Sequence, residues 1–160
     1  MITNNFMKLA LDQARIALAK NEVPVGAVIV ENNKVLSSAH NSTSLSFDPS
    51  AHCEILSIRK ACFDKQSFRL DNCDIYVTLE PCLMCFWAIR LARIKRIYYA
   101  LADEKFGAIS NNSILKSSNY AYPKIEIYDG ICESESKELL QNFFQSKRAK
   151  QHEKIYQKDL

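Results

Sequence analysis

The sequence has few of the residues that interrupt or extend a compact chain. Its 160 residues include only three glycines and four prolines, and no stretch is rich in either. It contains no internal repeat and no low-complexity tract. These absences exclude a flexible linker and a repeat array. Because a domain usually takes roughly 100–200 residues, we expect residues 1–160 to form a single domain.

Long apolar runs are absent as well. No segment approaches the roughly 18 apolar residues that suggest a membrane-spanning helix. The first residues show no basic stretch followed by an apolar core, so no secretory signal is expected. We therefore expect a cytoplasmic protein with no membrane partner. The formal net charge of only +3 permits a nucleic-acid partner without requiring one.

Disulfides are not expected, although the chain has six cysteines. In a reducing cytoplasm, cysteines are more often free thiols or metal ligands. A domain of this length buries about 70% of its unfolded surface, so it needs no metal merely to fold. A metal bound here is therefore expected to take part in chemistry.

The hydrophobic pattern predicts helices over about residues 4–20, 48–62, 81–92 and 133–147. In the second of these, Asp48 is the expected N-cap and Pro49 the first helical residue. The first is expected to bury one apolar stripe, composed of Phe6, Leu9, Ala10, Gln13, Ala14, Ala17 and Leu18.

Short apolar or alternating runs predict strands between these helices, at residues 27–30, 34–40, 74–79, 96–101 and 124–128. Asn32-Asn33 is the expected hairpin turn, residues 41–47 are expected to form a loop, and residues 103–123 a long connection. Strands separated by helices of ten or more residues favour an α/β fold, a mixed sheet with helices on both faces.

Two short segments carry residue types that bind metals. Residues 48–54 contain His52, and residues 80–85 contain Cys82 and Cys85. On a helix, positions i and i+3 project from one face, so both thiolates can reach one ion. One imidazole with two thiolates suits Zn²⁺. Three protein ligands leave the fourth position open to water, as in catalytic zinc sites.

Glu54 is the expected catalytic residue. Zinc lowers the pKa of a bound water towards neutrality. A nearby carboxylate can take a proton from that water and deliver it to a ring nitrogen and to a departing amine. His-x-Glu followed by Pro-Cys-x-x-Cys is the signature of zinc deaminases. A structural zinc site is the alternative, and it would need a fourth ligand from Cys53, Cys62 or Cys73.

With these motifs, the chain resembles the bacterial tRNA-specific adenosine deaminases, which convert the wobble adenosine of an anticodon to inosine. The resemblance covers about residues 4–150, and residues 21–28, 48–55, 76–85, 103–108 and 143–148 carry it. It implies a three-layer α/β/α fold with a five-stranded mixed sheet of the cytidine deaminase type. It also implies one Zn²⁺ per subunit, a tRNA anticodon stem-loop as substrate, and a homodimer with active sites near the interface.

The resemblance further implies substrate contacts by position. Asn41 matches the asparagine that hydrogen-bonds the base, and Val23 and Pro24 match the wall of the pocket. Asp103 and Lys105 match a loop that touches the flanking anticodon nucleotides.

A C-terminal helix over residues 133–148 matches one that packs on the anticodon loop, and Phe144, Lys147 and Arg148 match its RNA contacts. Phe143 and Phe144 are adjacent in the helix and cannot both face the same way. We expect Phe143 in the core and Phe144 near RNA. Lys147 and Arg148 could equally form a solvated helix end that the helix dipole favours.

Three positions depart from the family pattern. Cys53 stands where the family usually has alanine. We expect its thiol to pack as a small hydrophobic group, and its backbone N–H could still face the substrate. Ala100 and Ser110 stand where the family has glycine, both near the nucleotide-contacting loop.

Two other functions are compatible with the metal motif. A deaminase of free guanine or cytosine bases or nucleosides would share the zinc site and differ in the rest of the pocket. A non-enzymatic zinc- or RNA-binding module would keep the metal and have no need of Glu54. Wobble-adenosine deamination remains the leading hypothesis, since an unpaired loop lets the target base flip out of the stack.

Overall fold

A computed structural model describes residues 2–110 and 124–156. The helices are α1 (Ile2–Ala19), α2 (Thr43–Ser46), α3 (Cys53–Lys65), α4 (Leu83–Leu91) and α5 (Glu133–Tyr156). The strands are β1 (Gly26–Glu31), β2 (Lys34–His40), β3 (Cys73–Leu79), β4 (Arg96–Leu101) and β5 (Glu126–Tyr128). No helix among these residues is both long enough and apolar enough to cross a membrane.

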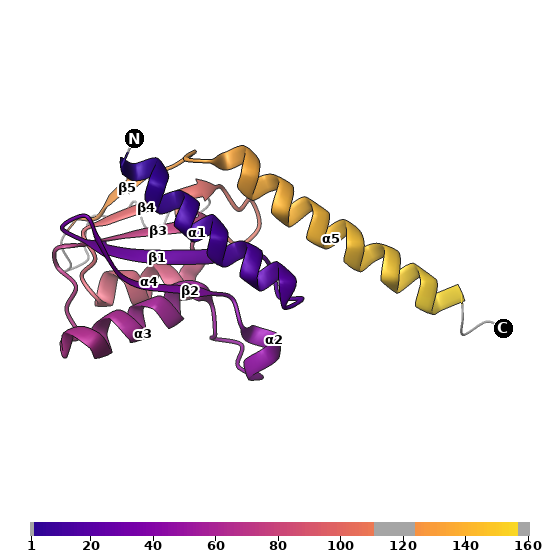
Figure 1. Ribbon diagram of the computed structural model, residues 1–160, viewed down its shortest axis with the longest axis horizontal. Coiled ribbons are helices and arrows are strands. Elements are labelled where there is room, and N and C mark those ends of the chain that lie inside the picture. The colour runs from indigo at the N-terminus through magenta and orange to yellow at the C-terminus, as the bar shows by residue number, and fades with distance from the viewer. Residues whose placement is uncertain (1, 111–123, 157–160) are drawn as a thin grey trace.

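The five strands form one mixed sheet in the order β2-β1-β3-β4-β5. Strand β1 pairs antiparallel with β2 and β3, whereas β3–β4 and β4–β5 are parallel. Helices α1 and α5 lie on one side of the sheet, and α3 and α4 lie on the other (Figure 1). The predicted three-layer fold with a five-stranded mixed sheet is confirmed.

The predicted hairpin is also confirmed. Asn32 and Asn33 have φ angles of 50° and 62°, and they connect β1 directly to β2. Two left-handed residues make the turn whose twist matches that of the flanking strands. The hairpin places β1 inside the sheet and β2 at its edge.

Helix α1 packs on the sheet through a stripe that differs from the predicted one. Its most buried side chains are Met7, Ala10, Leu11, Ala14 and Ala17. The prediction for Leu9 was wrong, since this side chain is 43% exposed. The helix backbone comes so close to β1 that a Cβ on Gly26 would lie 2.1 Å from the carbonyl oxygen of Ala10. This approach turns the small alanines towards the sheet.

The start of α3 was predicted too early. Asp48 Oδ1 accepts hydrogen bonds from the backbone N–H of Ser50 at 2.8 Å and from its hydroxyl at 2.7 Å. A side chain that bonds its local backbone in this way competes with helix formation. The chain therefore turns after Asp48 and becomes helical only at Cys53.

Other boundaries differ in similar ways. Helix α4 begins at Leu83 rather than Pro81, and the short helix α2 lies within the predicted loop. Helix α5 continues to Tyr156, beyond the predicted end at residue 147, and projects past the sheet (Figure 1). Residues 111–123 of the predicted long connection lie outside the described residues.

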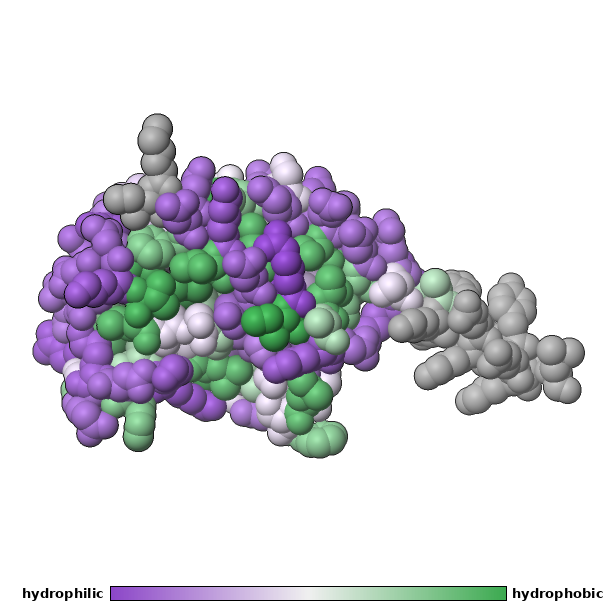
Figure 2. Space-filling view, viewed as in Figure 1, coloured by the Kyte–Doolittle hydropathy of each residue, from purple (hydrophilic) through white to green (hydrophobic). Residues whose placement is uncertain are grey.

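The side chains of the sheet pack in two cores. The larger lies against α3 and α4 and includes Ile75, Val77 and Phe86, while the smaller lies under α1 and includes Met7. On the face shown in Figure 2, apolar side chains gather between α1 and α3, with hydrophilic side chains around them. The two cores bury the central strands on both faces. The ends of β1 and β3 are therefore held in place, and the loops that follow these strands start from fixed positions.

Candidate active site

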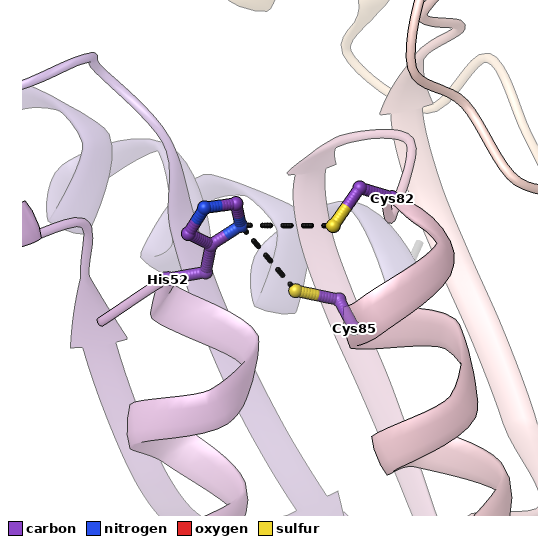
Figure 3. Close-up of side chains that lie close together, drawn as sticks. All are labelled: His52, Cys82 and Cys85. Atoms are coloured by element: carbon purple, nitrogen blue, oxygen red, sulfur yellow. Dashed lines mark hydrogen bonds between the residues drawn. The ribbon is translucent and has the colours of Figure 1, made fainter. Parts of the chain in front are cut away.

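Three metal-binding side chains that are distant in sequence converge at one point. The Nδ1 atom of His52 lies 3.8 Å from the sulfur of Cys82 and 3.5 Å from that of Cys85. All three possible ligand atoms lie within 4.8 Å of one another. Figure 3 shows the imidazole pointing from the start of α3 towards both sulfurs at the start of α4.

The ends of two helices create this convergence. His52 is the N-cap of α3 and Cys82 the N-cap of α4, both with extended backbone. Only Cys85 lies within a helix, so the prediction that both cysteines project from one helical face was wrong for Cys82. On a regular helix, His52 and Glu54 would lie about 200° apart. The extended N-cap removes this restriction, and both residues reach the same cavity.

The geometry of the cluster fits a zinc ion. Tetrahedral zinc with usual bond lengths separates a nitrogen and a sulfur ligand by about 3.6 Å, close to the two distances here. The Cys85 thiol donates a hydrogen bond to Cys82, which lowers the pKa of Cys82 to about 4. The same bond and burial raise the pKa of Cys85. One thiolate thus forms readily, and a bound cation would favour the second.

The cluster has room for a ligand other than protein. Among the described residues, no fourth histidine, cysteine or carboxylate joins the three. Three protein ligands leave the open position typical of a catalytic site. All six cysteines are free, and neither Cys62 nor Cys73 belongs to the cluster, so the alternative of a structural zinc site lacks a fourth ligand here.

Glu54 lies beside the cluster and is only 4% exposed. Burial raises the pKa of its carboxyl group. The thiol of Cys53 donates a hydrogen bond to Glu54 Oε2 at 3.1 Å. Cys53 is fully buried in the larger core, so its thiol packs as predicted and in addition contacts the expected catalytic carboxyl.

A cavity of about 380 Å³ opens over this cluster. Among the predicted site residues, those that line it are Val23, Asn41, His52, Glu54, Cys82 and Asp103. Pro24 is buried and does not line the cavity, whereas Val25 does. Lys105 is exposed on the loop that follows Asp103.

Asn41 is held in one orientation in the cavity wall. Its Oδ1 accepts the backbone N–H of Cys53 at 2.9 Å. The backbone N–H of Asn41 donates to the backbone carbonyl of Val25 at 3.0 Å. The Cys53 N–H is therefore occupied, which speaks against the expectation that it contacts substrate. Oδ1 is occupied by the protein, and Nδ2 is the donor of the side chain that can serve a ligand.

Two buried carboxylates beside the cavity were not predicted. Glu80 is 3% exposed and accepts the backbone N–H groups of Asp103, Ile109 and Ser110 at 2.7–2.9 Å. The hydroxyl of Ser110, where glycine was expected, donates to both Glu80 oxygens. Glu80 thereby fixes the loop of residues 103–110. The only sequence signal was a carboxylate between an apolar strand and Pro81.

Glu22 is a second buried carboxylate that fixes a segment beside the cavity, the one that contains α2. It is 1% exposed, and its Oε1 accepts the backbone N–H of Leu45 at 2.7 Å. Its Oε2 accepts the hydroxyl of Thr43 at 3.3 Å. Glu22 thus holds α2, from which Thr43 lines the cavity.

Helix α5 presents the pair of aromatic residues as predicted. Phe143 is 6% exposed and Phe144 is 46% exposed. The Nζ atom of Lys147 lies 5.1 Å from the centre of the Phe143 ring, a cation–π distance, while Arg148 is exposed. The core position of Phe143 is confirmed, and RNA contact by the other residues stays a prediction.

Comparison with known proteins places this arrangement among deaminases. The model of the MafB19-like deaminase family matches residues 1–148. A relative from Agrobacterium fabrum, named tRNA-specific adenosine deaminase, is 44% identical over 144 residues, which are 90% of this chain and 95% of that protein. A solved structure from studies of A-to-I editing by tRNA:A34 deaminases is 44% identical. The TM-score is 0.81, and the matched region covers 85% of this chain and 99% of the chain in the solved structure.

A second solved structure, guanine deaminase from Bacillus subtilis, is also similar. It is 39% identical but covers only 61% of this chain and 63% of that one, with a TM-score of 0.60. The shared portion is thus smaller than with the tRNA-specific deaminases.

Proposed function

Since the chain belongs to the MafB19-like deaminases and to the family of tRNA-specific adenosine deaminases, we propose that it hydrolyses the wobble adenosine of a tRNA anticodon to inosine and ammonia. One observation supports this above the others. The cluster of His52, Cys82 and Cys85 faces a cavity that also contains Glu54.

The three clustered residues would hold one Zn²⁺ per subunit. A bound zinc ion supplies a water that is activated at neutral pH. Asn41 Nδ2 holds the flipped adenine by donating a hydrogen bond to the ring. The Glu54 carboxylate takes one proton from the attacking water and gives it to ring nitrogen N1, while the water oxygen bonds to C6.

Glu54 then moves the second proton. It takes this proton from the new hydroxyl on C6 and delivers it to the exocyclic amine, so that the C6–N bond breaks and ammonia leaves. The product has a carbonyl at C6 and a proton on N1. The raised pKa of Glu54 suits this role, since a carboxyl whose pKa lies nearer the working pH both accepts and donates protons effectively.

The anticodon stem-loop would lie across the cavity mouth. Asp103 lines the cavity and Lys105 is exposed on the same loop, so both are available for contacts to neighbouring nucleotides. Phe144, Lys147 and Arg148 would extend the contact along α5. Aromatic faces and cationic groups are what a surface for unpaired nucleotides uses. A tRNA substrate supports a cytoplasmic location for the reaction.

We further propose that the protein is a homodimer with active sites near the interface. Helix α4, which carries Cys85, exposes Leu83, Met84 and Leu91 by 43%, 40% and 56%. Apolar side chains grouped on one helix are a typical interface feature. A second subunit that covers them would lie directly beside the metal cluster.

The decisive experiment is incubation of the zinc-loaded protein with an anticodon stem-loop that carries wobble adenosine. We expect inosine and ammonia in equal amounts. Glu54→Gln should retain about one zinc and normal RNA affinity while turnover falls by about 10²- to 10⁴-fold, the usual contribution of a general acid–base. Asp12→Asn, which changes an exposed carboxylate on α1, serves as the control.

Two outcomes would contradict the proposal. Release of ammonia from free guanine but not from the stem-loop would assign the chain to base deamination, as its similarity to guanine deaminase allows. Unchanged biological activity of Glu54→Gln would instead favour a zinc- or RNA-binding module.

A further inference from the structure

Phe106 exposes most of its side chain at the rim of the cavity. The side chain of Phe106 is 71% exposed. Three other phenylalanines are more exposed, namely Phe47 at 95%, Phe63 at 74% and Phe68 at 79%. Among the described phenylalanines, Phe106 alone lines the cavity. Its ring thus lies where a bound substrate passes, and it contributes little to either core.

The backbone on the near side of Phe106 is held by Asp103. Asp103 Oδ1 accepts the backbone N–H of Lys105 at 2.9 Å and that of Phe106 at 3.1 Å. The carbonyl of Asp103 accepts the N–H of Gly107 at 2.9 Å. These three bonds close a tight turn around the phenylalanine.

The backbone that follows Phe106 is held by residues at the start of α4, next to the metal cluster. Gly107 forms an isolated β-bridge with Cys82, and Ala108 donates its N–H to the carbonyl of Pro81 at 3.0 Å. A Cβ on Gly107 would lie 2.4 Å from the Glu80 carboxyl, so this position admits only glycine without rearrangement. The exposed ring is therefore carried by a backbone that is fixed relative to the metal ligands.

We propose that Phe106 is a stacking platform for a nucleobase next to the flipped adenine, an inference that rests on the proposed function. When the target base leaves the stack, its neighbours lose a stacking partner. A phenyl ring at the cavity rim replaces that partner. Because every base has a π-face, stacking of this kind tolerates different sequences, so Phe106 contributes binding of the loop rather than recognition of one anticodon. A fixed backbone reduces the ordering cost of binding.

Fluorescence and kinetics test this directly. Stem-loops carry 2-aminopurine at the 5′ or the 3′ neighbour of the wobble position, and Glu54→Gln protein prevents turnover. We expect quenching at one neighbour, loss of quenching in the Glu54→Gln, Phe106→Ala double variant, and its return with Phe106→Tyr. In active protein, Phe106→Ala should lower kcat/KM for the stem-loop by about 5- to 100-fold, mainly through KM, as expected for loss of one base–aromatic stack.

Two controls separate stacking from a structural role. Phe68→Ala removes a ring of similar exposure that does not line the cavity, and it should leave kcat/KM and quenching unchanged. A stem-loop with an abasic residue at the neighbouring position should lower the kcat/KM of the wild-type protein by the same factor as Phe106→Ala does on the intact stem-loop. On this abasic stem-loop, Phe106→Ala should lower kcat/KM no further. Zinc content and thermal melting confirm that each variant is folded.

The outcomes distinguish this inference from the proposed function. If wild-type protein forms inosine and Phe106→Ala behaves like Phe68→Ala, the stacking role is overturned while the proposed function stands. An equal loss on intact and abasic stem-loops would also overturn stacking, since it would show an effect independent of the neighbouring base. Absence of inosine with wild-type protein would overturn the proposed function and this inference together.

Discussion

Cys53 and Glu54 are adjacent residues whose side chains meet beside the metal cluster. In the proposed mechanism Glu54 acts as a base only when its carboxyl is deprotonated, so activity should fall as the pH falls through its pKa. Burial raises this pKa, which moves the acid limb of the pH profile above the range of an ordinary glutamate. The hydrogen bond from the Cys53 thiol stabilises the carboxylate and opposes that shift.

Removal of the thiol should therefore raise the pKa of Glu54 further. We expect Cys53→Ala to retain its zinc and its activity on the plateau of the pH profile, while the acid limb of kcat/KM moves to higher pH, because the carboxylate loses a hydrogen bond that stabilises it. The measurement is kcat/KM of inosine formation between pH 5 and 8, together with metal content.

Two variants complete the series. Cys53→Ser keeps a donor at this position and should restore most of the wild-type profile. Cys73→Ala removes a buried thiol outside the metal cluster and should leave the acid limb in place. An unshifted limb in Cys53→Ala would show that the thiol acts only by packing, and loss of zinc would give it a role at the metal.

At the scale of the structural elements, the loop of residues 103–110 is held by one side chain, Glu80. Glu80 accepts three backbone N–H groups and the hydroxyl of Ser110. Glu80→Gln replaces one accepting oxygen by a donor that faces these N–H groups. A buried donor left without a partner costs about 1–3 kcal/mol, so the free energy of unfolding should fall by that amount.

Denaturant unfolding and substrate kinetics check this expectation. Thermal melting should show a decrease of about 2–4 °C for each kcal/mol in a protein of this size. The stem-loop KM should rise because the loop edge of the cavity is loosened. Ser110→Ala should have a smaller effect in the same direction, and Glu138→Gln, an exposed carboxylate on α5, should have none. Equal stability of Glu80→Gln and Glu138→Gln would refute the role of Glu80.

At the scale of the whole molecule, we expect the cores to stabilise the protein independently of any bound metal. The central strands are buried on both faces without any contribution from a metal. A ligand that binds only the folded state adds stability by mass action, about 2.7 kcal/mol when its free concentration is 100 times its Kd. Metal removal should therefore lower stability without unfolding the chain.

Chelation of the zinc-loaded protein is expected to abolish inosine formation, lower the melting temperature and preserve the far-UV circular dichroism spectrum. Re-addition of zinc should restore activity and melting temperature together. Collapse of the secondary structure on chelation would contradict this expectation and show that the metal is required for folding.

Much of this protein could be predicted from local sequence patterns. Short apolar or alternating runs predicted all five strands, and Asn32-Asn33 predicted the hairpin, because these features depend on the chain within a few residues. The spacing of His-x-Glu and Pro-Cys-x-x-Cys indicated a metal cluster, since these residue types in this order serve few other purposes. Helix boundaries were less predictable, because the local hydrogen bonds of Asp48 displaced the start of α3 to Cys53.

What only the tertiary structure decided are the contacts between segments that are distant in sequence. The burial of Met7 in place of Leu9 follows from the close approach of α1 to Gly26. The roles of Glu80 and the placement of Phe106 follow from packing of the 103–110 loop against the start of α4. The spacing of apolar residues along the chain predicts helices and strands, because each has its own periodicity. The hydrogen-bond partners of a buried carboxylate are determined only when the sheet brings two distant loops together. Sequence alone therefore predicted the chemistry, and the fold decided which side chains support it.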